Sequence, residues 1–382
     1  MIIPWMKSIR LLVITPLLFL CACAGAPQAE PEQEKKDRGE FEVLHYHLKS
    51  RMAISADCSA GAALVMRDGK VIYEEYLGTV HRGPGAAPVT GRSRFPFYSL
   101  SKGFGSAVVL SLATEGLIDL DDPVCKYLPD FKGPGPNGKY LREHVKISHL
   151  ASHTSGVTQE KSSYDSYDGS SMFGDVTLEF EPGTEFRYGE LAMRILGQVL
   201  EIAGGKPYDR LLQERILDPL GLNSVGFLKR GADTVDVVHT CAGFDSSHIA
   251  YSNRHSAKTK ATPGFGLFGN VRDIGRYAQL WLDGGRVGDR LIFHEELIKE
   301  AWSTQPPGRR PDPDYGILFW LFPRVKSYVF SGAGHSICAI LPERKMVLVM
   351  GLNQRGGGVW DFQTEKINLA NIGHAIAERL DR

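Results

Sequence analysis

The sequence predicts an α+β fold, an antiparallel β-sheet flanked by terminal helices and carrying a large, mostly helical insertion. Strand-like runs occur early, at 61–66 and 71–76 with a short run at 95–98, and they return after residue 314. The residues between about 100 and 300 follow the period of helices instead. Strands at the two ends of a chain form one sheet only if the segment between them is an insertion.

The first elements form a hairpin, because Arg67-Asp68-Gly69-Lys70 is a turn between two strand-like runs. An amphipathic segment, 41–53, precedes it. Helical periodicity predicts helices at 104–116, 189–204, 207–216, 271–283 and 294–302. Strand patterns follow at 315–322, 327–331, 336–341 and 346–352, and a helix at 364–380 ends the chain.

Composition places the chain among globular proteins of one large or two interleaved domains, with 382 residues, 43% hydrophobic and 23% charged. Lys plus Arg and Asp plus Glu are equal at 44 each, and no basic stripe stands out. The electrostatic pattern of a nucleic-acid-binding protein is therefore missing.

The N-terminus has the pattern of an export signal. Two basic residues precede the apolar stretch 11–20, which ends in Leu20-Cys21-Ala22-Cys23 and is too short to span a bilayer. A lipoprotein signal needs a small residue before the cysteine, and Ala22 before Cys23 meets that need. We expect lipidation at Cys23 and a protein anchored in the bacterial cell envelope, facing the periplasm. An ordinary secretory signal cut within 22–26 is the alternative.

Residues 24–40 are rich in Pro and charge and have no apolar periodicity, which predicts a flexible tether. The expected organisation is a signal at 1–23, this tether, and a folded domain at 41–382. Within that domain we expect a sheet part at about 41–100 and 310–382 and a helical part at about 101–309.

The pattern with most chemical content is Ser99-Leu100-Ser101-Lys102, between the strand-like run 95–98 and a small-residue helix at 103–116. Residues i and i+3 share a helix face, so the Lys102 ammonium reaches the Ser99 hydroxyl. A serine needs such a base to act as a nucleophile near neutral pH. The helix is apolar on nearly every face, which indicates burial, and burial lowers the pKa of a lysine.

Further motifs lie around this tetrapeptide in a fixed order. They are Gly116-Leu117-Ile118-Asp119-Leu120-Asp121-Asp122-Pro123-Val124, Leu128-Pro129, Ile147-Ser148-His149-Leu150-Ala151-Ser152-His153-Thr154-Ser155-Gly156 and Glu181-Pro182-Gly183-Thr184-Glu185-Phe186-Arg187-Tyr188. Over roughly residues 45–355 the chain resembles the serine β-lactamase and penicillin-binding-protein superfamily, nearest its class C β-lactamase and esterase branch.

The resemblance implies a second box, Y-x-N, at the start of a helix facing the nucleophile. Tyr188-Gly189-Glu190 takes that place, so the tyrosine is kept and the asparagine is not. A literal Y-x-N at Tyr251-Ser252-Asn253 lacks the preceding Pro-Gly turn and the following apolar helix, and we interpret it as unrelated.

The resemblance also implies a third box, K-T-G or H-x-G, on a strand beside the site. It falls at Phe330-Ser331-Gly332-Ala333-Gly334, so Phe330 stands where the family has a cation. Gly332 allows close backbone approach, Ser331 offers a hydroxyl, and the N–H groups of Ser99 and Ala333 would form an oxyanion hole. His335 and Glu190 are further candidate neighbours of the site.

Together these features predict a serine hydrolase that forms an acyl-enzyme on Ser99. Lys102, held neutral by burial and neighbouring positive charge, accepts the serine proton, and Tyr188 relays a proton to the leaving group. No metal or organic cofactor is implied. Without the third-box cation, we expect a carboxylesterase-like enzyme acting on uncharged esters or amides.

Other functions stay open: a β-lactamase, a peptidase acting on D-amino-acid or cell-wall substrates, and a catalytically decayed binding module tethered to the envelope. The expected partners are a small ester, amide or peptide substrate and the membrane that holds the lipid anchor. Cys58, Cys125, Cys241 and Cys338 have no spacing that specifies a bridge, and buried free thiols are the expected state. The sequence leaves the oligomeric state, the physiological substrate and the role of the 159–179 insertion open.

Overall fold

The computed structural model describes residues 38–54, 58–135, 138–158, 176–228, 233–239, 261–305, 314–354 and 362–382. Residue contacts separate Met1–Gly39 from a second compact unit, Glu40–Arg382. The fold that follows is that of this second unit. The export signal, Cys23, most of the tether, Cys241, Tyr251-Ser252-Asn253 and most of the 159–179 insertion lie outside the described residues.

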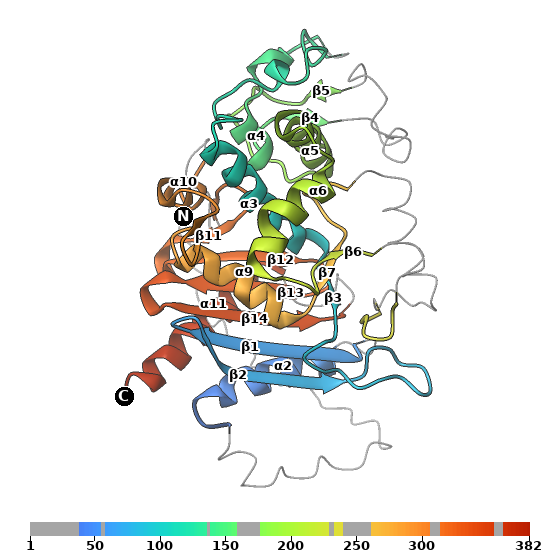
Figure 1. Cartoon of the computed structure of the whole chain (residues 1–382), viewed down its shortest axis with the longest axis vertical. Helices are drawn as coiled ribbons and strands as arrows, with labels where there is room; N and C mark the ends of the chain where they lie inside the picture. Colours follow the sequence, from blue (N-terminus) through green and yellow to red (C-terminus); the bar gives the residue numbers. More distant parts are fainter. Residues whose placement is uncertain are drawn as a thin grey trace, which may run out of the picture. The chain divides into compact units, whose positions relative to one another are not determined.

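The centre of the fold is a seven-stranded sheet whose neighbouring strands are all antiparallel, in the order β10-β11-β12-β13-β14-β1-β2. The N-terminal hairpin adds to the C-terminal strands because β1 pairs with β14, Gly61 opposite Leu352 and Arg67 opposite Met346. The sheet is therefore completed by the end of the chain, as the sequence predicts (Figure 1). Its strands are β1 (Ala60–Arg67), β2 (Lys70–Gly78), β10 (Asp314–Tyr315), β11 (Trp320–Phe322), β12 (Ser327–Gly332), β13 (Ser336–Leu341) and β14 (Met346–Leu352).

Helices cover both faces of this sheet. On one face α2 (Glu42–Ile54) and α11 (Phe362–Leu380) pack on the strands, and their leucines and isoleucines form one apolar cluster with alternate residues of β1, β13 and β14. On the other face α9 (Val271–Leu282) packs on β1, β13 and β14, and α3 (Ser101–Thr114) packs on β12. Asn270 caps α9, its Oδ1 accepting from the Asp273 N–H at 2.8 Å.

The inserted part is mostly helical. Its longer helices are α3, α5 (Glu190–Gly204), α9 and α10 (Glu295–Ala301), and its shorter ones are α4 (Ile147–Ala151), α6 (Tyr208–Leu212) and α7 (Asp218–Leu220). Its small strands are β3 (Phe95–Pro96), β4 (Val157–Thr158), β5 (Thr177–Leu178), β6 (Gly226–Phe227), β7 (Leu267–Gly269), β8 (Arg286–Val287) and β9 (Arg290–Leu291).

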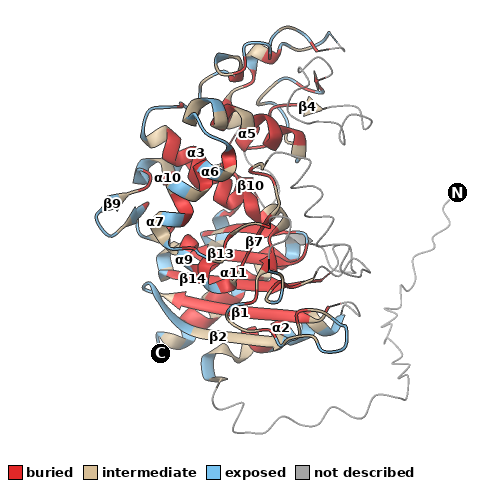
Figure 2. Cartoon of the chain, turned by 45° about the vertical axis from the view of Figure 1, so that its right-hand side comes forward, coloured by how far each residue is buried: buried red, intermediate tan, exposed pale blue. Residues whose placement is uncertain are grey.

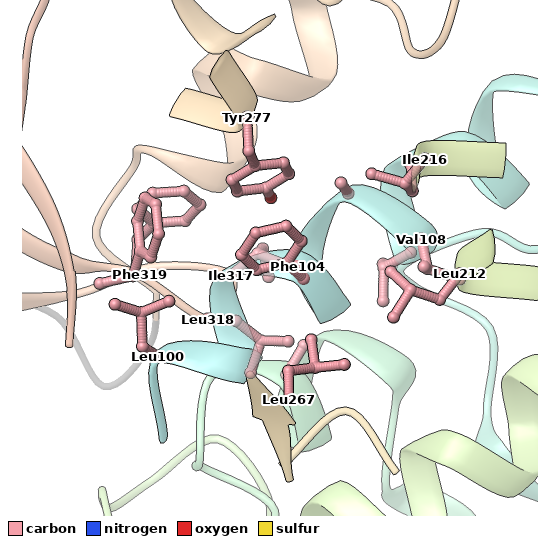
Figure 3. Close-up of a cluster of buried hydrophobic side chains, with 14 of the residues drawn as sticks. Leu100, Phe104, Val108, Leu212, Ile216, Leu267, Tyr277, Ile317, Leu318 and Phe319 are labelled. Carbon is pink, nitrogen blue, oxygen red and sulfur yellow. The ribbon is translucent and has the colours of Figure 1, made fainter. Parts of the chain in front are cut away.

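Helix α3 runs through the main core, and its residues from Ser101 to Leu112 are all buried (Figure 2). The Phe104 ring stacks on Tyr277 of α9, with ring centroids 3.9 Å apart (Figure 3). Small residues let α3 approach β12 closely. A Cβ on Gly103 would lie 2.7 Å from the Phe330 ring. A helix without a polar face is stable only when neighbours enclose it, as they do here.

Two elements differ from the sequence prediction. The expected strand at 315–322 is a hairpin, β10 and β11, because the Gly316 N–H bonds to the Phe319 carbonyl at 2.9 Å and turns the chain. The expected helix at 207–216 is α6 followed by a π-helical segment, η7 (Gln213–Leu217). A pattern of apolar residues alone does not distinguish these local geometries.

Among the described cysteines, Cys58, Cys125 and Cys338 are free thiols, and the first and last are buried, as predicted. In the part of the chain that the structure describes, no helix is long and apolar enough to cross a membrane.

Candidate active site

Ser99 lies in a single 3-10 turn, η2 (Tyr98–Leu100), directly before α3. Lys102 belongs to the first turn of α3 and is 2% exposed, whereas Ser99 is only partly buried. The Lys102 Nζ donates to Ser99 Oγ at 3.2 Å. The spacing of three residues therefore brings the two groups together as predicted, although the serine precedes the α-helix.

Lys102 has two further partners from distant parts of the chain. Its Nζ lies 3.4 Å from Glu190 Oε2 at the start of α5 and donates to the Gly264 carbonyl at 2.8 Å. A Cβ on Gly264 would lie 1.9 Å from Glu190 Oε1, so a larger residue there would have to displace the carboxylate from its place beside the ammonium. Nothing in the local sequence around residue 264 indicates this contact.

The protonation state of Lys102 differs from the prediction. Burial acts to lower the pKa of Lys102, but the Glu190 carboxylate and the Tyr188 phenol raise it, and the pKa ends above its usual value. The charged neighbour is a carboxylate and not a cation, so the expectation of a neutral Lys102 at rest is wrong. Replacement of the family's asparagine by Glu190 is the physical reason.

Tyr188 lies beside this pair, with the Lys102 Nζ 5.0 Å from the centre of its ring. The side chain is 39% exposed and stacks on Trp320, with centroids 5.8 Å apart and planes 14° apart. The His153 ring packs against both Tyr188 and Tyr315. Its centroid lies 4.2 Å from that of Tyr188 and 5.3 Å from that of Tyr315. We call Phe186, Tyr188, Tyr315 and Trp320 the aromatic wall; the sequence reasoning did not identify Tyr315 or Trp320 as part of the site.

The third-box segment ends in a tight turn against the residues before Ser99. The His335 N–H bonds to the Gly332 carbonyl at 2.9 Å, and the Ser336 Oγ donates to the Pro96 carbonyl at 3.1 Å. Ala333, at the tip, is exposed. This turn therefore presents the Ala333 backbone beside the segment that leads into Ser99.

One edge of β12 is open next to this turn. Strand β11 pairs with β12 only from Ser327 to Val329. From Phe330 to Gly332 the pairing within the described residues is with β13 alone. An unpaired strand edge beside a nucleophile is a suitable place for the backbone or the carbonyl group of a substrate.

Three residues that the sequence predicts beside the site, Phe330, Ser331 and His335, have side chains that point away from Ser99. Phe330 is 1% exposed and packs on Gly103, Tyr277 and Phe319, so the expectation that it borders the substrate is not met. Ser331 alternates with it and lies on the face of Val329 that meets α2 and α11, and its Oγ has no hydrogen-bond partner within the described residues. The structure therefore does not bring this hydroxyl to Ser99.

His335 is also enclosed, at 4% exposure, with a backbone φ of 63°. Burial, and to a smaller extent Arg51, lower the pKa of His335 to about 4, and Glu365 opposes them. Arg51 and Glu365 belong to α2 and α11, so His335 interacts with the helices behind the sheet. Within the described residues no cluster of three or more His, Cys, Asp or Glu side chains forms a metal site.

The amino-acid sequence of this protein is similar to those of known proteins. The sequence profile named Beta-lactamase matches residues 47–372. A protein of Escherichia coli K12 named "Putative D-alanyl-D-alanine carboxypeptidase" is 23% identical over 427 residues, covering 96% of this chain and 97% of its own length. "Esterase EstB" of Burkholderia gladioli is 28% identical over 205 residues, covering 49% of this chain and 50% of its own length.

Solved structures share the fold. A penicillin-binding protein homolog from Caulobacter crescentus matches with a TM-score of 0.72 at 17% identity, over 88% of this chain and 97% of its own. EstCE1, described as a hydrolase with promiscuous acyltransferase activity, matches with a TM-score of 0.71 at 18% identity, over 90% of this chain and all of its own.

The fold is that of the β-lactamase and penicillin-binding-protein superfamily. Because the profile matches most of the chain, this protein belongs to the Beta-lactamase family, whose members include hydrolases.

Proposed function

We propose that this protein is a serine hydrolase that forms an acyl-enzyme on Ser99 and acts as a carboxylesterase on uncharged esters. The observation that carries the proposal is the 3.2 Å contact between Ser99 Oγ and Lys102 Nζ at the N-terminal end of a buried helix. A partly exposed hydroxyl with a buried amine beside it is the arrangement that nucleophilic catalysis needs.

The reaction proceeds in two steps. Lys102 first gives its proton to solvent. Ser99 Oγ then attacks the ester carbonyl and its proton passes to the neutral Lys102, while the backbone N–H groups of Ser99 and Ala333 stabilise the oxyanion. Tyr188 relays a proton to the departing alcohol, and water then hydrolyses the acyl-enzyme. Each oxyanion donor typically contributes about 3 to 4 kcal/mol to the barrier reduction.

Charge supports the uncharged substrate class. Lys102 already interacts with the Glu190 carboxylate and the Gly264 carbonyl, so its charge is engaged within the protein. Strand β12 contains no lysine, arginine or histidine, and its Phe330 and Ser331 side chains both point away from Ser99. A substrate carboxylate buried without a cationic partner is costly. The exposed part of the aromatic wall favours an apolar acyl or alcohol group.

A second candidate is a peptidase that removes a C-terminal D-amino acid. It is favoured by the full-length similarity to the Escherichia coli protein named for that activity. Its substrate has a free carboxylate, and so does a β-lactam. The esterase therefore needs a site that accepts an uncharged substrate, whereas the peptidase needs a site that accepts a negatively charged one.

The test compares kcat/KM for p-nitrophenyl esters of short acids, for a penicillin, for a cephalosporin and for a peptide ending in D-Ala-D-Ala. We expect the neutral esters to be hydrolysed fastest. Efficient turnover of the D-Ala-D-Ala peptide or of either β-lactam would instead support one of the other activities. Lys102→Ala and Tyr188→Phe should each lower ester kcat/KM by orders of magnitude, since residues that act as one unit in proton transfer fail together.

We also propose that the mature protein is exported and held at the bacterial envelope by lipid on Cys23. This proposal is supported by the order of basic, apolar and small residues before Cys23.

A further inference from the structure

Tyr188 lies in a segment that has no regular secondary structure. Residues 185–189 form neither helix nor strand, and α5 begins only at Glu190. The Tyr188 side chain is exposed, so the packing of its own ring fixes it only in part. Its phenol nevertheless acts on Lys102, whose pKa it helps to raise. An accurate position for this phenol therefore depends on contacts that hold the backbone on either side of it.

A single residue, His153, makes those contacts. Its carbonyl accepts from the Arg187 N–H at 2.8 Å, and its Nδ1 accepts from the Gly189 N–H at 3.4 Å. Arg187 and Gly189 directly precede and follow Tyr188. The His153 ring also packs on the Tyr188 ring, with centroids 4.2 Å apart. One residue therefore holds the backbone on both sides of the phenol and the ring that carries it.

The backbone conformation of His153 belongs to this arrangement. Its φ is 57°, in the left-handed region that is uncommon for a residue with a large side chain. In this conformation the carbonyl and the imidazole both face the segment 187–189, as their two hydrogen bonds show. Backbone strain of this kind persists only where the surroundings hold the residue, and it is concentrated at functional sites.

The loop that carries His153 is itself held in place. Residues 152–155 are all buried. The Thr154 carbonyl accepts from the Gly183 N–H at 2.8 Å, and the Ala151 carbonyl accepts from the Leu318 N–H at 3.0 Å. This loop therefore joins the segment before α5 to the β10–β11 hairpin, and these are the two elements that carry the aromatic wall.

The chemistry of the imidazole fits a supporting role. A ring nitrogen that accepts a hydrogen bond carries no proton, so the contact with Gly189 requires the proton of His153 to lie on Nε2. The side chain is 1% exposed and is enclosed by the rings of Phe186, Tyr188 and Tyr315. A substrate therefore meets Tyr188 and not His153.

We propose that His153 is a positioning residue for Tyr188, which holds the segment 187–189 so that the phenol lies where it can protonate the leaving group. The inference rests on the proposed function, in which Tyr188 passes to the alcohol oxygen the proton that Lys102 took from Ser99, as the C–O bond breaks. It goes beyond that function by giving a role to a residue outside the reacting groups.

The test compares kcat/KM for the p-nitrophenyl ester and the ethyl ester of the same short acid, because kcat/KM reports on acylation, the step in which the alcohol departs. A p-nitrophenolate departs without a proton, whereas an ethoxide has to be protonated as it departs. His153→Phe keeps an aromatic ring but removes the Nδ1 acceptor. It should lower kcat/KM about 100-fold for the ethyl ester, as expected for a displacement of about 1 Å. The loss for the p-nitrophenyl ester should be about tenfold or less.

Two further variants separate the acceptor from the ring. His153→Asn has an amide oxygen that can accept from Gly189, and asparagine tolerates a positive φ, so the ratio of the two esters should stay near that of the parent. His153→Leu has a similar size but no acceptor, and its ratio should change as in His153→Phe. His144→Phe, at an exposed histidine, is the matched control and should change neither rate.

A double variant tests whether His153 acts through Tyr188. Tyr188→Phe should itself lower turnover of the ethyl ester more than turnover of the p-nitrophenyl ester. Addition of His153→Phe to Tyr188→Phe should cause no further loss with the ethyl ester, because the two residues serve one step. Thermal unfolding of each variant measures any loss of stability separately from the ratio of the two esters.

Equal losses for both esters in His153→Phe and His153→Leu would show that His153 only stabilises the fold, and would overturn the inference. An additive loss in the double variant, or a change of ratio in His153→Asn as large as that in His153→Leu, would also contradict it. Absence of a Ser99 acyl-enzyme in the parent would overturn the proposed function itself. Acylation of Ser99 together with any of the former outcomes would overturn only the role of His153.

Discussion

Gly332 at the end of β12 touches the backbone of Phe97, two residues before the candidate nucleophile. A Cβ on Gly332 would lie 1.8 Å from the Phe97 carbonyl oxygen and 3.1 Å from the Tyr98 Cβ. Both are rigid parts of the chain, so no flexible side chain could give way. This contact brings the Ala333 turn and the Ser99 turn together.

Gly332→Ala should therefore lower kcat by about 100-fold, because a displacement of about 1 Å between reacting groups has that effect. It should also lower the free energy of unfolding by about 1 to 3 kcal/mol. Gly226→Ala is the matched control, since nothing lies within 4 Å of a Cβ built there. Ester kinetics and urea unfolding measure both effects, and equal behaviour of the two variants would contradict the contact.

Phe330→Lys should destabilise the fold and should not create a binding site for a carboxylate. The ring is enclosed by Gly103, Tyr277 and Phe319, and an unpaired buried ammonium is costly. We expect a loss of more than about 3 kcal/mol, whereas Phe330→Leu should cost less than that. Denaturant unfolding decides the point. A stable lysine variant with improved penicillin hydrolysis would show that this position faces the substrate.

Acid should destabilise the protein partly through His335. Its pKa is about 4 in the folded protein against an ordinary 6.5, so between these values the unfolded chain binds a proton that the folded chain does not. This contribution to stability is present above about pH 6.5 and is lost as the pH falls toward 4. His335→Gln should therefore flatten the fall in unfolding free energy from pH 7 to pH 5 by on the order of 1 to 2 kcal/mol. The exposed His294→Gln is the control, and an unchanged slope in His335→Gln would count against this assignment.

Cys23 should carry lipid in the mature protein. The prediction comes from the run Leu20-Cys21-Ala22-Cys23, which lies outside the described residues. The protein should fractionate with membranes and need detergent for extraction, and mass spectrometry should find a lipid-modified N-terminal cysteine. An unmodified N-terminus beyond Cys23 would indicate a secretory signal alone.

The single antiparallel sheet completed by the C-terminal strands and the burial of α3 could be predicted, because the strand patterns and the apolar helix can be read within short segments. The Ser99 to Lys102 contact was predictable for the same reason, since it spans one helical turn. The charge of Lys102 was not, because Glu190 and Gly264 are 88 and 162 residues away from it. The position of Phe330 was not predictable either, since its environment depends on how β12 packs on α3 and α9.

The measurement that tests the account most directly is peptide mass spectrometry of protein quenched during turnover of a p-nitrophenyl ester, or after treatment with a fluorophosphonate probe. We expect one adduct, on Ser99, which disappears together with ester turnover in a folded Ser99→Ala variant. Ser101→Ala should still be modified at Ser99, because Ser101 is buried and its Oγ accepts from the Leu267 N–H. An adduct on another residue, or ester hydrolysis that survives in Ser99→Ala, would contradict the assignment of Ser99 as the nucleophile.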